Sequence, residues 1–194
     1  MKYFPQLKAL LFFACLIPLL RLVWMGYAGE LGANPIELIT RSLGTWTLVF
    51  LLITLSITPL RQLSGWSWII KLRRMAGLFA FFYALLHFIT YIWLDQFFDM
   101  SSIVKDVIKR PFITIGFTAF ILLIPLAITS TNVMMKKMGG KNWQLLHKLV
   151  YLIAIFAVIH YWWLVKKDIT QPLIYAGLLA VLLAYRMISM KLIK

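Results

Sequence analysis

The chain has 194 residues, of which 62% are hydrophobic, whereas soluble domains are about 45–50% apolar. A soluble core cannot absorb this much apolar sequence, so we expect lipid to be the solvent and residues 1–194 to form one domain. The single cysteine, Cys15, excludes an internal disulfide and any zinc or iron–sulfur site built from cysteines. The net charge of +14 could indicate a nucleic-acid-binding protein, but its distribution along the chain favours membrane orientation instead.

Six apolar runs are close to the length of about 17–25 residues that a membrane-spanning helix requires. They are Leu7–Ala28, Leu43–Leu60, Met75–Leu94, Phe112–Ile128, Leu145–Val165 and Leu173–Met190. The first run lacks a signal-peptide cleavage site and five more runs follow it, so we expect it to be retained. Short connections between the runs predict an all-α integral membrane protein, a six-helix up-and-down bundle.

Charged residues are divided unequally between the two sides of this bundle. With the N-terminus in the cytoplasm, all six acidic residues fall in outer segments. Most lysines and arginines fall in inner segments, where there are 13 of the 20: Lys2, Lys8, Arg61, Lys71, Arg73, Arg74, Lys136, Lys137, Lys141, Lys148, Arg186, Lys191 and Lys194. Because inner loops are enriched in Lys and Arg, this pattern predicts a multi-pass protein with both termini in the cytoplasm.

All three histidines lie inside apolar runs, where an ionisable residue predicts a functional site. At 1.5 Å per residue, His87 lies about 18 Å and His160 about 22 Å from the inner ends of their helices. These two helices run in the same direction, so we expect His87 and His160 to face each other in the outer half. His147 lies only about 3 Å from the inner end, and about 20 Å below His160, which predicts a separate inner site.

Two neutral imidazoles that face each other across a gap between helices suit a six-coordinate haem iron. The runs around them are rich in aromatic residues, which suit a buried porphyrin, and no C-x-x-C-H motif is present. The sequence therefore predicts one non-covalent, b-type haem held by His87 and His160. The alternative interpretation is that the histidines form interhelical hydrogen bonds and the aromatic residues simply fill the bundle.

The inner site has no second histidine to pair with His147. A second haem there would need another axial ligand, and methionine sulfur is one candidate. The methionines at a suitable level are Met75, Met134, Met135 and Met138. His147 could equally hydrogen-bond a quinone, a flavin such as FMN, or a haem propionate, and the sequence leaves these alternatives open.

Three arginines are further candidates for binding a cofactor. Arg21 lies within the first apolar run, where it either pairs with a haem propionate or extends to the outer interface. Arg73 and Arg74 act first as determinants of orientation. They are also placed to bind a flavin phosphate or to dock an acidic partner.

Several stretches of the chain resemble the MsrQ (YedZ) family of haem-binding membrane subunits. They are LGANP at 31–35, LITLSITPLR at 52–61, RRMAGLFAFFYALLHFITY at 73–91, KRPFITIGF at 109–117, ITSTNVMMKKMGGKNWQLLHKLVYLIAIFAVIHYWWLVK at 128–166 and QPLIYAG at 171–177. Wider relatives are ferric-reductase-like transmembrane domains and NADPH oxidases, which carry two histidines on each of two helices. This chain departs from that pattern, because its third apolar run carries only His87.

The resemblance implies a protein of the bacterial inner membrane that passes electrons to MsrP. MsrP is a periplasmic molybdopterin enzyme that reduces methionine sulfoxide and so repairs oxidised periplasmic proteins. The resemblance also implies the quinone pool or a cytosolic flavin reductase as electron donor, and an association with FMN. The chain would then be an electron-transfer subunit without catalytic residues of its own.

Two other functions remain open at the level of sequence. One is a stand-alone haem b reductase that acts on ferric iron or a quinone. The other is a non-redox transporter or assembly scaffold in which the histidines are structural. A reduced-minus-oxidised visible spectrum separates the scaffold from both redox functions.

We predict that a reporter active only in the periplasm stays inactive when it is fused after Lys194. Six spans place both ends on the same side, and the bias of Lys and Arg places that side in the cytoplasm. A cytoplasm-active reporter at the same position is the control. An active periplasmic reporter there would contradict the predicted orientation.

Overall fold

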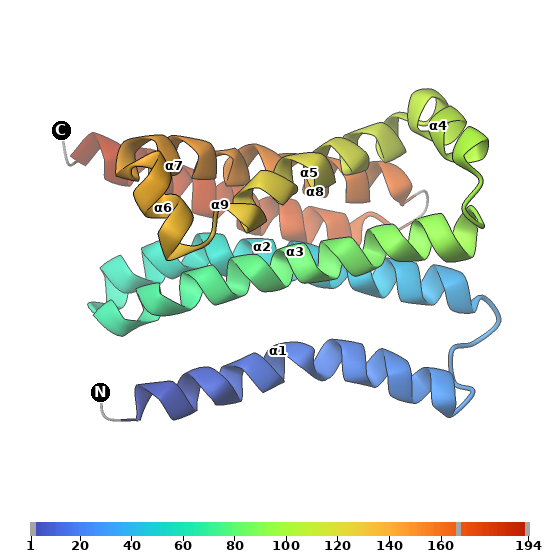
Figure 1. The fold of residues 1–194 in the computed structure, drawn as a ribbon, viewed down its shortest axis with the longest axis horizontal. Helices are drawn as coiled ribbons and strands as arrows, with labels where there is room; N and C mark the ends of the chain where they lie inside the picture. The colour runs from blue at the N-terminus through green and yellow to red at the C-terminus, as the bar shows by residue number, and fades with distance from the viewer. Residues whose placement is uncertain (1–2, 166–167, 193–194) are drawn as a thin grey trace.

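The computed structural model describes residues 3–165 and 168–192, and within these ranges every regular element is a helix. Six segments are long and apolar enough to cross a membrane, which confirms the predicted all-α membrane fold. They are Phe4–Tyr27, Pro35–Ser64, Ser67–Asp95, Pro111–Ile128, Gly140–Leu164 and Thr170–Ser189. The first and last described helices have their free ends at the same end of the molecule (Figure 1), as an even number of spans requires.

Helix boundaries differ from the predicted ones mainly at the ends of the apolar runs. The single-helix spans are α1 (Phe4–Tyr27), α2 (Pro35–Ser64), α5 (Pro111–Ile128) and α9 (Thr170–Leu192). The second span is the longest, because Asn34 caps its N-terminus beyond the apolar run and Gly65 ends it in a left-handed conformation. Its polar ends lie outside the hydropathy signal, so the sequence predicted a shorter helix.

Two of the spans are composite. The third consists of a 3₁₀ turn η1 (Ser67–Leu72), α3 (Arg73–Thr90) and a π-helical turn η2 (Tyr91–Asp95). The fifth consists of α7 (Gly140–His147) and α8 (Leu149–Leu164), which are separated by a break at Lys148. His147 therefore ends one helix, whereas the sequence predicted a continuous helix through both His147 and His160.

Two short helices occupy connections in which no helix was predicted. These are α4 (Met100–Lys109), between the third and fourth spans at the end of the bundle opposite the free ends of α1 and α9, and α6 (Asn132–Met138), before α7 at the end that holds those free ends. We call these two ends outer and inner, after the orientation predicted from the sequence. Asp99 caps α4 by accepting from the backbone N–H groups of Ser101 and Ser102, and Thr131 caps α6 in the same way. Both helices are too short to give a spanning signal, so hydropathy did not reveal them.

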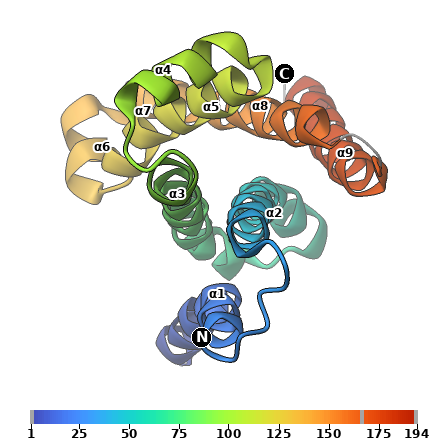
Figure 2. The same ribbon diagram turned by 90° about the vertical axis from the view of Figure 1, so that its right-hand side faces the viewer.

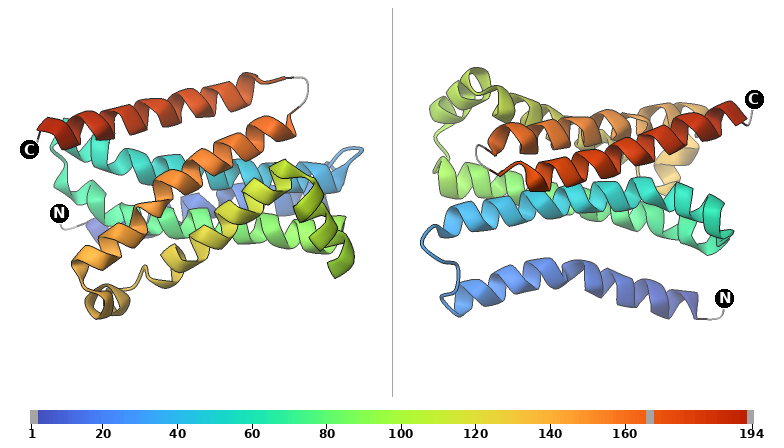
Figure 3. Two further views of the ribbon diagram at one scale, coloured as in Figure 1. Left: turned by 90° about the horizontal axis from the view of Figure 1, so that it is seen from above. Right: turned by 180° about the vertical axis from the view of Figure 1, so that it is seen from behind.

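The spans are arranged in three layers (Figures 1 and 2). The pair α2 and α3 forms the middle layer, α5, α8 and α9 cover one side of it, and α1 lies on the other side. The views in Figure 3 show α9 at the edge of the layer that contains α8, on the side away from α5. The helices that carry His87 and His160 each have one most extensive contact, because α3 packs along α2 and α8 packs along α5.

Small residues allow α2 and α3 to pack closely. Ala76, Ala80 and Ala84 follow one another at intervals of four on α3, and all three are buried. In lipid, such small residues let two helix backbones approach and gain packing energy. On a neighbouring stripe of α3, Tyr83 is fully buried and stacks on Phe50 of α2, with 5.3 Å between ring centroids.

Helix α1 is held by a few contacts with the middle layer. The hydroxyl of Tyr83 donates to the backbone carbonyl of Cys15 over 2.8 Å, and Phe12 packs on Phe79 with 5.1 Å between ring centroids. Large apolar side chains on the opposite side of α1, such as Leu20 and Trp24, are exposed. In a bilayer those side chains would contact lipid.

We expect Ala80→Leu to lower the free energy of unfolding by about 1–3 kcal/mol, because Ala80 is fully buried and a larger side chain would overpack the α2–α3 contact. The measurement is thermal unfolding of the purified protein in detergent. Ala184→Leu is the matched control, since Ala184 is exposed on α9. Equal stability of the two variants would contradict the close packing of α2 on α3.

Candidate functional site

The structure brings His87 of α3 and His160 of α8 together in the outer half of the bundle. Their ring centroids lie 6.2 Å apart, and the ring planes make an angle of 76°. If each ring bound one metal ion through a bond of about 2 Å, with about 1 Å from nitrogen to ring centre, the ring centres would be about 6 Å apart. The observed spacing therefore suits a single ion between the two imidazoles.

Both imidazoles are held by backbone carbonyl groups of the neighbouring helix. Nδ1 of His87 lies 2.8 Å from the carbonyl oxygen of Thr40 on α2, and Nδ1 of His160 lies 2.6 Å from that of Phe112 on α5. A carbonyl oxygen can only accept, so each Nδ1 carries the proton and donates. In a neutral imidazole this leaves Nε2 with a free lone pair on both rings, which is the form that ligates a metal.

Two glycines make room for these rings. The His87 ring packs on Gly44 of α2, where an added methyl carbon would lie 3.1 Å from Cε1. The His160 ring packs on Gly116 of α5, where an added methyl carbon would lie 2.6 Å from Nδ1. Neither glycine was singled out from the sequence, because a glycine inside an apolar run shows its purpose only when the neighbouring helix is known.

Aromatic side chains extend from this histidine pair toward the inner half. Tyr83 lies one turn below His87 on α3 and stacks on Phe50, which also stacks on Phe79 with 5.5 Å between centroids. On the other side of α3, Phe88 stacks on Phe120 of α5 with 4.6 Å between centroids. These aromatic side chains form contacts between helices.

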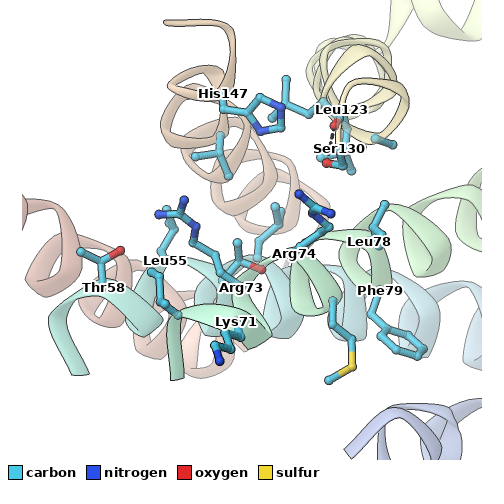
Figure 4. A pocket seen from close by; sticks show the side chains of 18 of the residues that line it. Leu55, Thr58, Lys71, Arg73, Arg74, Leu78, Phe79, Leu123, Ser130 and His147 are labelled. Carbon is cyan, nitrogen blue, oxygen red and sulfur yellow. Dashed lines mark hydrogen bonds between the residues drawn. The ribbon is translucent and has the colours of Figure 1, made fainter. Parts of the chain in front are cut away.

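A large cavity occupies the inner half of the molecule (Figure 4). Its volume is about 1370 Å³, which exceeds the usual range of about 300–1,000 Å³ for a small-molecule pocket. Described residues of every spanning segment line it, and no acidic side chain is among them. The lining includes six cationic side chains: Lys8, Lys71, Arg73, Arg74, Lys148 and Arg186. An anionic, planar ligand would suit this combination of room and charge.

His147 lies on the wall of this inner cavity, with a different hydrogen bond from the other two histidines. Its Nε2 is 3.0 Å from the hydroxyl oxygen of Thr129, and that hydroxyl is 2.6 Å from the carbonyl oxygen of Pro125. The hydroxyl has one proton and must donate it to the carbonyl, so it accepts from Nε2–H of His147. The free nitrogen of His147 in this conformation is therefore Nδ1.

Trp143 fixes the His147 ring from one side. The two rings stack with 3.9 Å between centroids and 26° between planes. The Trp143 indole N–H donates to the backbone carbonyl of Thr129 over 2.8 Å. Thr129 therefore holds both rings, that of Trp143 by its carbonyl and that of His147 by its hydroxyl. For Nε2 of His147 to bind a metal ion, its hydrogen bond to Thr129 would have to break.

The two inner arginines predicted from the sequence lie at this cavity. Figure 4 shows Arg73 and Arg74 extending from α3 toward the side of the cavity that holds His147. Arg74 also donates to the side-chain oxygen of Asn132 on α6 over 2.6 Å. Of the methionines considered as partners of His147, Met75 and Met135 line the cavity, whereas Met134 and Met138 are not part of its lining.

Arg21, in contrast, is not brought to the histidine pair. Its side chain is exposed on α1, where it borders a shallow groove formed by residues of that helix alone. Trp24 and Tyr27 border the same groove. This position suits extension toward the outer interface, and its pairing with a haem propionate gains no support from the geometry.

Several cavity residues were not recognised as site residues from the sequence. Arg186 of α9 reaches the cavity and lies over the ring of Tyr151, with 5.8 Å from its guanidinium carbon to the ring centroid. Lys8 and Lys148 had been assigned only to orientation. A cluster of inner cations was visible in the sequence, but their convergence on one cavity depends on how six spans pack.

Comparison with known proteins finds one matching family model and several similar proteins. Residues 40–158 match the family model described as "Ferric reductase like transmembrane component", a range that includes His87 and His147 and ends just before His160. The chain is 60% identical over 187 residues to a protein of Herminiimonas arsenicoxydans, covering 94% of this chain and 86% of the relative. It is 52% identical to a protein of Azospira oryzae, covering 97% of this chain and 81% of the relative. It is 53% identical to a protein of Rhodospirillum rubrum, covering 91% of this chain and 85% of the relative.

All three relatives are named "Protein-methionine-sulfoxide reductase heme-binding subunit MsrQ". These identities extend over nearly the whole chain, and the family model covers more than half of it. The chain therefore belongs to the MsrQ family of haem-binding subunits, within the ferric-reductase-like transmembrane proteins.

Proposed function

We propose that this chain is a b-type haem subunit that carries electrons across the bacterial inner membrane to a periplasmic methionine sulfoxide reductase. The observation that carries the proposal is the pair His87 and His160, with ring centroids 6.2 Å apart and both Nδ1 atoms bonded to carbonyl oxygens. The names of the relatives support it, since they describe haem-binding subunits of a methionine sulfoxide reductase.

The donor set favours haem over an ion bound by the protein alone. A structural zinc ion takes four ligands and a catalytic one takes three from the protein. Among the described residues there is no group of three or more histidine, cysteine, aspartate or glutamate side chains that could hold an ion. A porphyrin supplies four nitrogen ligands itself, so two opposed imidazoles are sufficient. When bound, haem supplies a one-electron couple between ferric and ferrous iron.

The protein's own contribution at this outer site is orientation. The carbonyl groups of Thr40 and Phe112 hold the two rings by Nδ1–H and leave both Nε2 atoms free, so that these atoms would bind the iron. Both histidines are partly buried between helices rich in apolar and aromatic side chains. In a bilayer this arrangement would limit the access of water to a reduced centre.

The inner cavity is the proposed site at which electrons are received. Its cations, including Arg73, Arg74 and Arg186, suit the propionates of a second haem or the phosphate of FMN, and its apolar walls also suit a quinone. His147 would bind this group, either by ligation or by a hydrogen bond. The proposed donor is the quinone pool or a cytosolic flavin reductase, and the proposed acceptor is MsrP on the outer side.

A stand-alone ferric reductase is the second candidate, and the description of the matching family model favours it. The curated relatives at 52–60% identity carry the name of the sulfoxide reductase subunit instead. We therefore place delivery of electrons to a periplasmic sulfoxide reductase first.

We expect His87→Ala and His160→Ala each to remove most of the six-coordinate, low-spin haem of the outer site, because each imidazole would bind the iron. The measurement is the visible spectrum and the ratio of haem to protein after purification in detergent. Both variants should still insert, since the hydrogen bonds of each span's backbone stay intact. His147→Ala is the matched control. A full complement of low-spin haem in either variant would contradict the role of that residue.

We expect His147→Ala to slow reduction of the protein by a flavin reductase about two- to tenfold, since a neutral hydrogen bond contributes about 0.5–1.5 kcal/mol. The low-spin spectrum of the outer site should persist, and a small chemical reductant should still reduce the protein. Stopped-flow absorbance with each reductant checks this. Loss of all haem would place His147 in the outer site or in folding. Wild-type rates with every donor would mean that the inner site lies elsewhere.

A further inference from the structure

The same arrangement of three groups occurs twice around the histidine pair. On α3 and α2, His87 bonds the carbonyl of Thr40 and packs on Gly44. On α8 and α5, His160 bonds the carbonyl of Phe112 and packs on Gly116. In both cases the glycine follows the carbonyl residue by four positions on the same helix.

This spacing has a physical reason. In an α-helix, the carbonyl of one residue accepts the N–H of the residue four positions later, so each histidine shares its carbonyl with the amide of the glycine. The Cα–Cβ bond of a helical residue tilts toward the N-terminus, so a side chain at the later position would lean over that carbonyl. At these two positions glycine leaves room for an imidazole ring beside the carbonyl.

We propose that Gly44 and Gly116 are positioning residues, because the room they leave for the imidazole rings sets the orientation and the proton location of His87 and His160 at the carbonyls of Thr40 and Phe112. This inference rests on the proposed ligation of haem by His87 and His160. The two glycines act through the histidines and need not touch the haem.

The two positions differ in how much room they leave. At Gly116, an added methyl carbon would lie 2.6 Å from Nδ1 and 2.8 Å from Cε1 of His160, so the ring must move. At Gly44, it would lie 3.1 Å from Cε1 and 3.2 Å from Nδ1 of His87, so a shift of a few tenths of an ångström relieves the contact. The effect of alanine is therefore graded, and it is larger on the His160 side.

Movement of either ring would change the midpoint potential and the largest g value of the haem. A substitution that affects only the packing of the fold would change neither. A donated Nδ1–H bond raises the basicity of the ligating nitrogen, which stabilises ferric iron, so loss of the bond raises the midpoint potential. The angle between the two imidazole planes, 76° here, sets the largest g value of a low-spin ferric haem. A displaced ring changes that angle.

The experiment compares Gly116→Ala and Gly44→Ala with the wild-type protein, purified with its haem. Gly177→Ala is the matched control, because Gly177 lies in α9 and an added methyl carbon there has nothing within 4 Å. Alanine is a better helix former than glycine, so all three variants retain helix propensity. Haem content, the ferric EPR spectrum and the midpoint potential are measured for each.

We expect Gly116→Ala to lose haem, or to retain it with a shifted largest g value and a more positive potential. Gly44→Ala should retain haem and show smaller shifts of the same kind, and Gly177→Ala should match the wild type. Wild-type spectra and potentials in both Gly44→Ala and Gly116→Ala would overturn the inference, as would equal shifts in Gly177→Ala. Haem that is unaffected by loss of His87 and His160 would instead overturn the proposed function on which the inference rests.

Discussion

Inside a bilayer, a polar side chain has no water to bond, so its partners must come from the protein. The Nδ1–H groups of His87 and His160 satisfy this constraint with backbone carbonyls of α2 and α5. Each bond ties a histidine-bearing helix to its neighbour and also leaves Nε2 as the free nitrogen of the ring. The geometry of the candidate haem site therefore depends on two hydrogen bonds that also add to the packing of α3 on α2 and of α8 on α5.

The outer and inner sites differ in ways that suit different tasks. The outer pair is tightly packed, with two glycines against the rings and aromatic contacts around them. The inner cavity is spacious and cationic, and His147 there is held by Thr129 and Trp143 through the opposite nitrogen. A rigid outer site suits a permanently bound cofactor, whereas a wide inner site with many cations suits an anionic group that exchanges electrons with a donor.

Much of this architecture could be predicted from the sequence, because hydropathy and charge bias act over whole spans. The six spans follow from apolar length, and the approach of His87 to His160 follows from their equal depth on two helices that run in the same direction. The helices α4 and α6 were missed because they are too short to give a spanning signal. The break at Lys148 was missed because the apolar pattern continues through it.

Features that depend on the facing helix could not be predicted. A glycine at position 44 or 116 is unremarkable in an apolar run until the histidine ring that occupies its space is known. In the same way, Arg186 and Lys8 are far apart in the chain and meet at one cavity only through packing. Arg21 was a candidate for binding a cofactor because it lies in an apolar run. The structure instead places its side chain on the exposed surface of α1.

The central claim is that one haem lies between α3 and α8 and is held by both outer histidines. A structure of the haem-loaded protein in a lipid nanodisc, at a resolution that shows side chains, tests this most directly. The account predicts one porphyrin between these helices, with its iron about 2 Å from Nε2 of both His87 and His160 and with both Nδ1 atoms still on the carbonyls of Thr40 and Phe112. Iron bound through only one of these histidines, or an outer half without a porphyrin in haem-loaded protein, would contradict it.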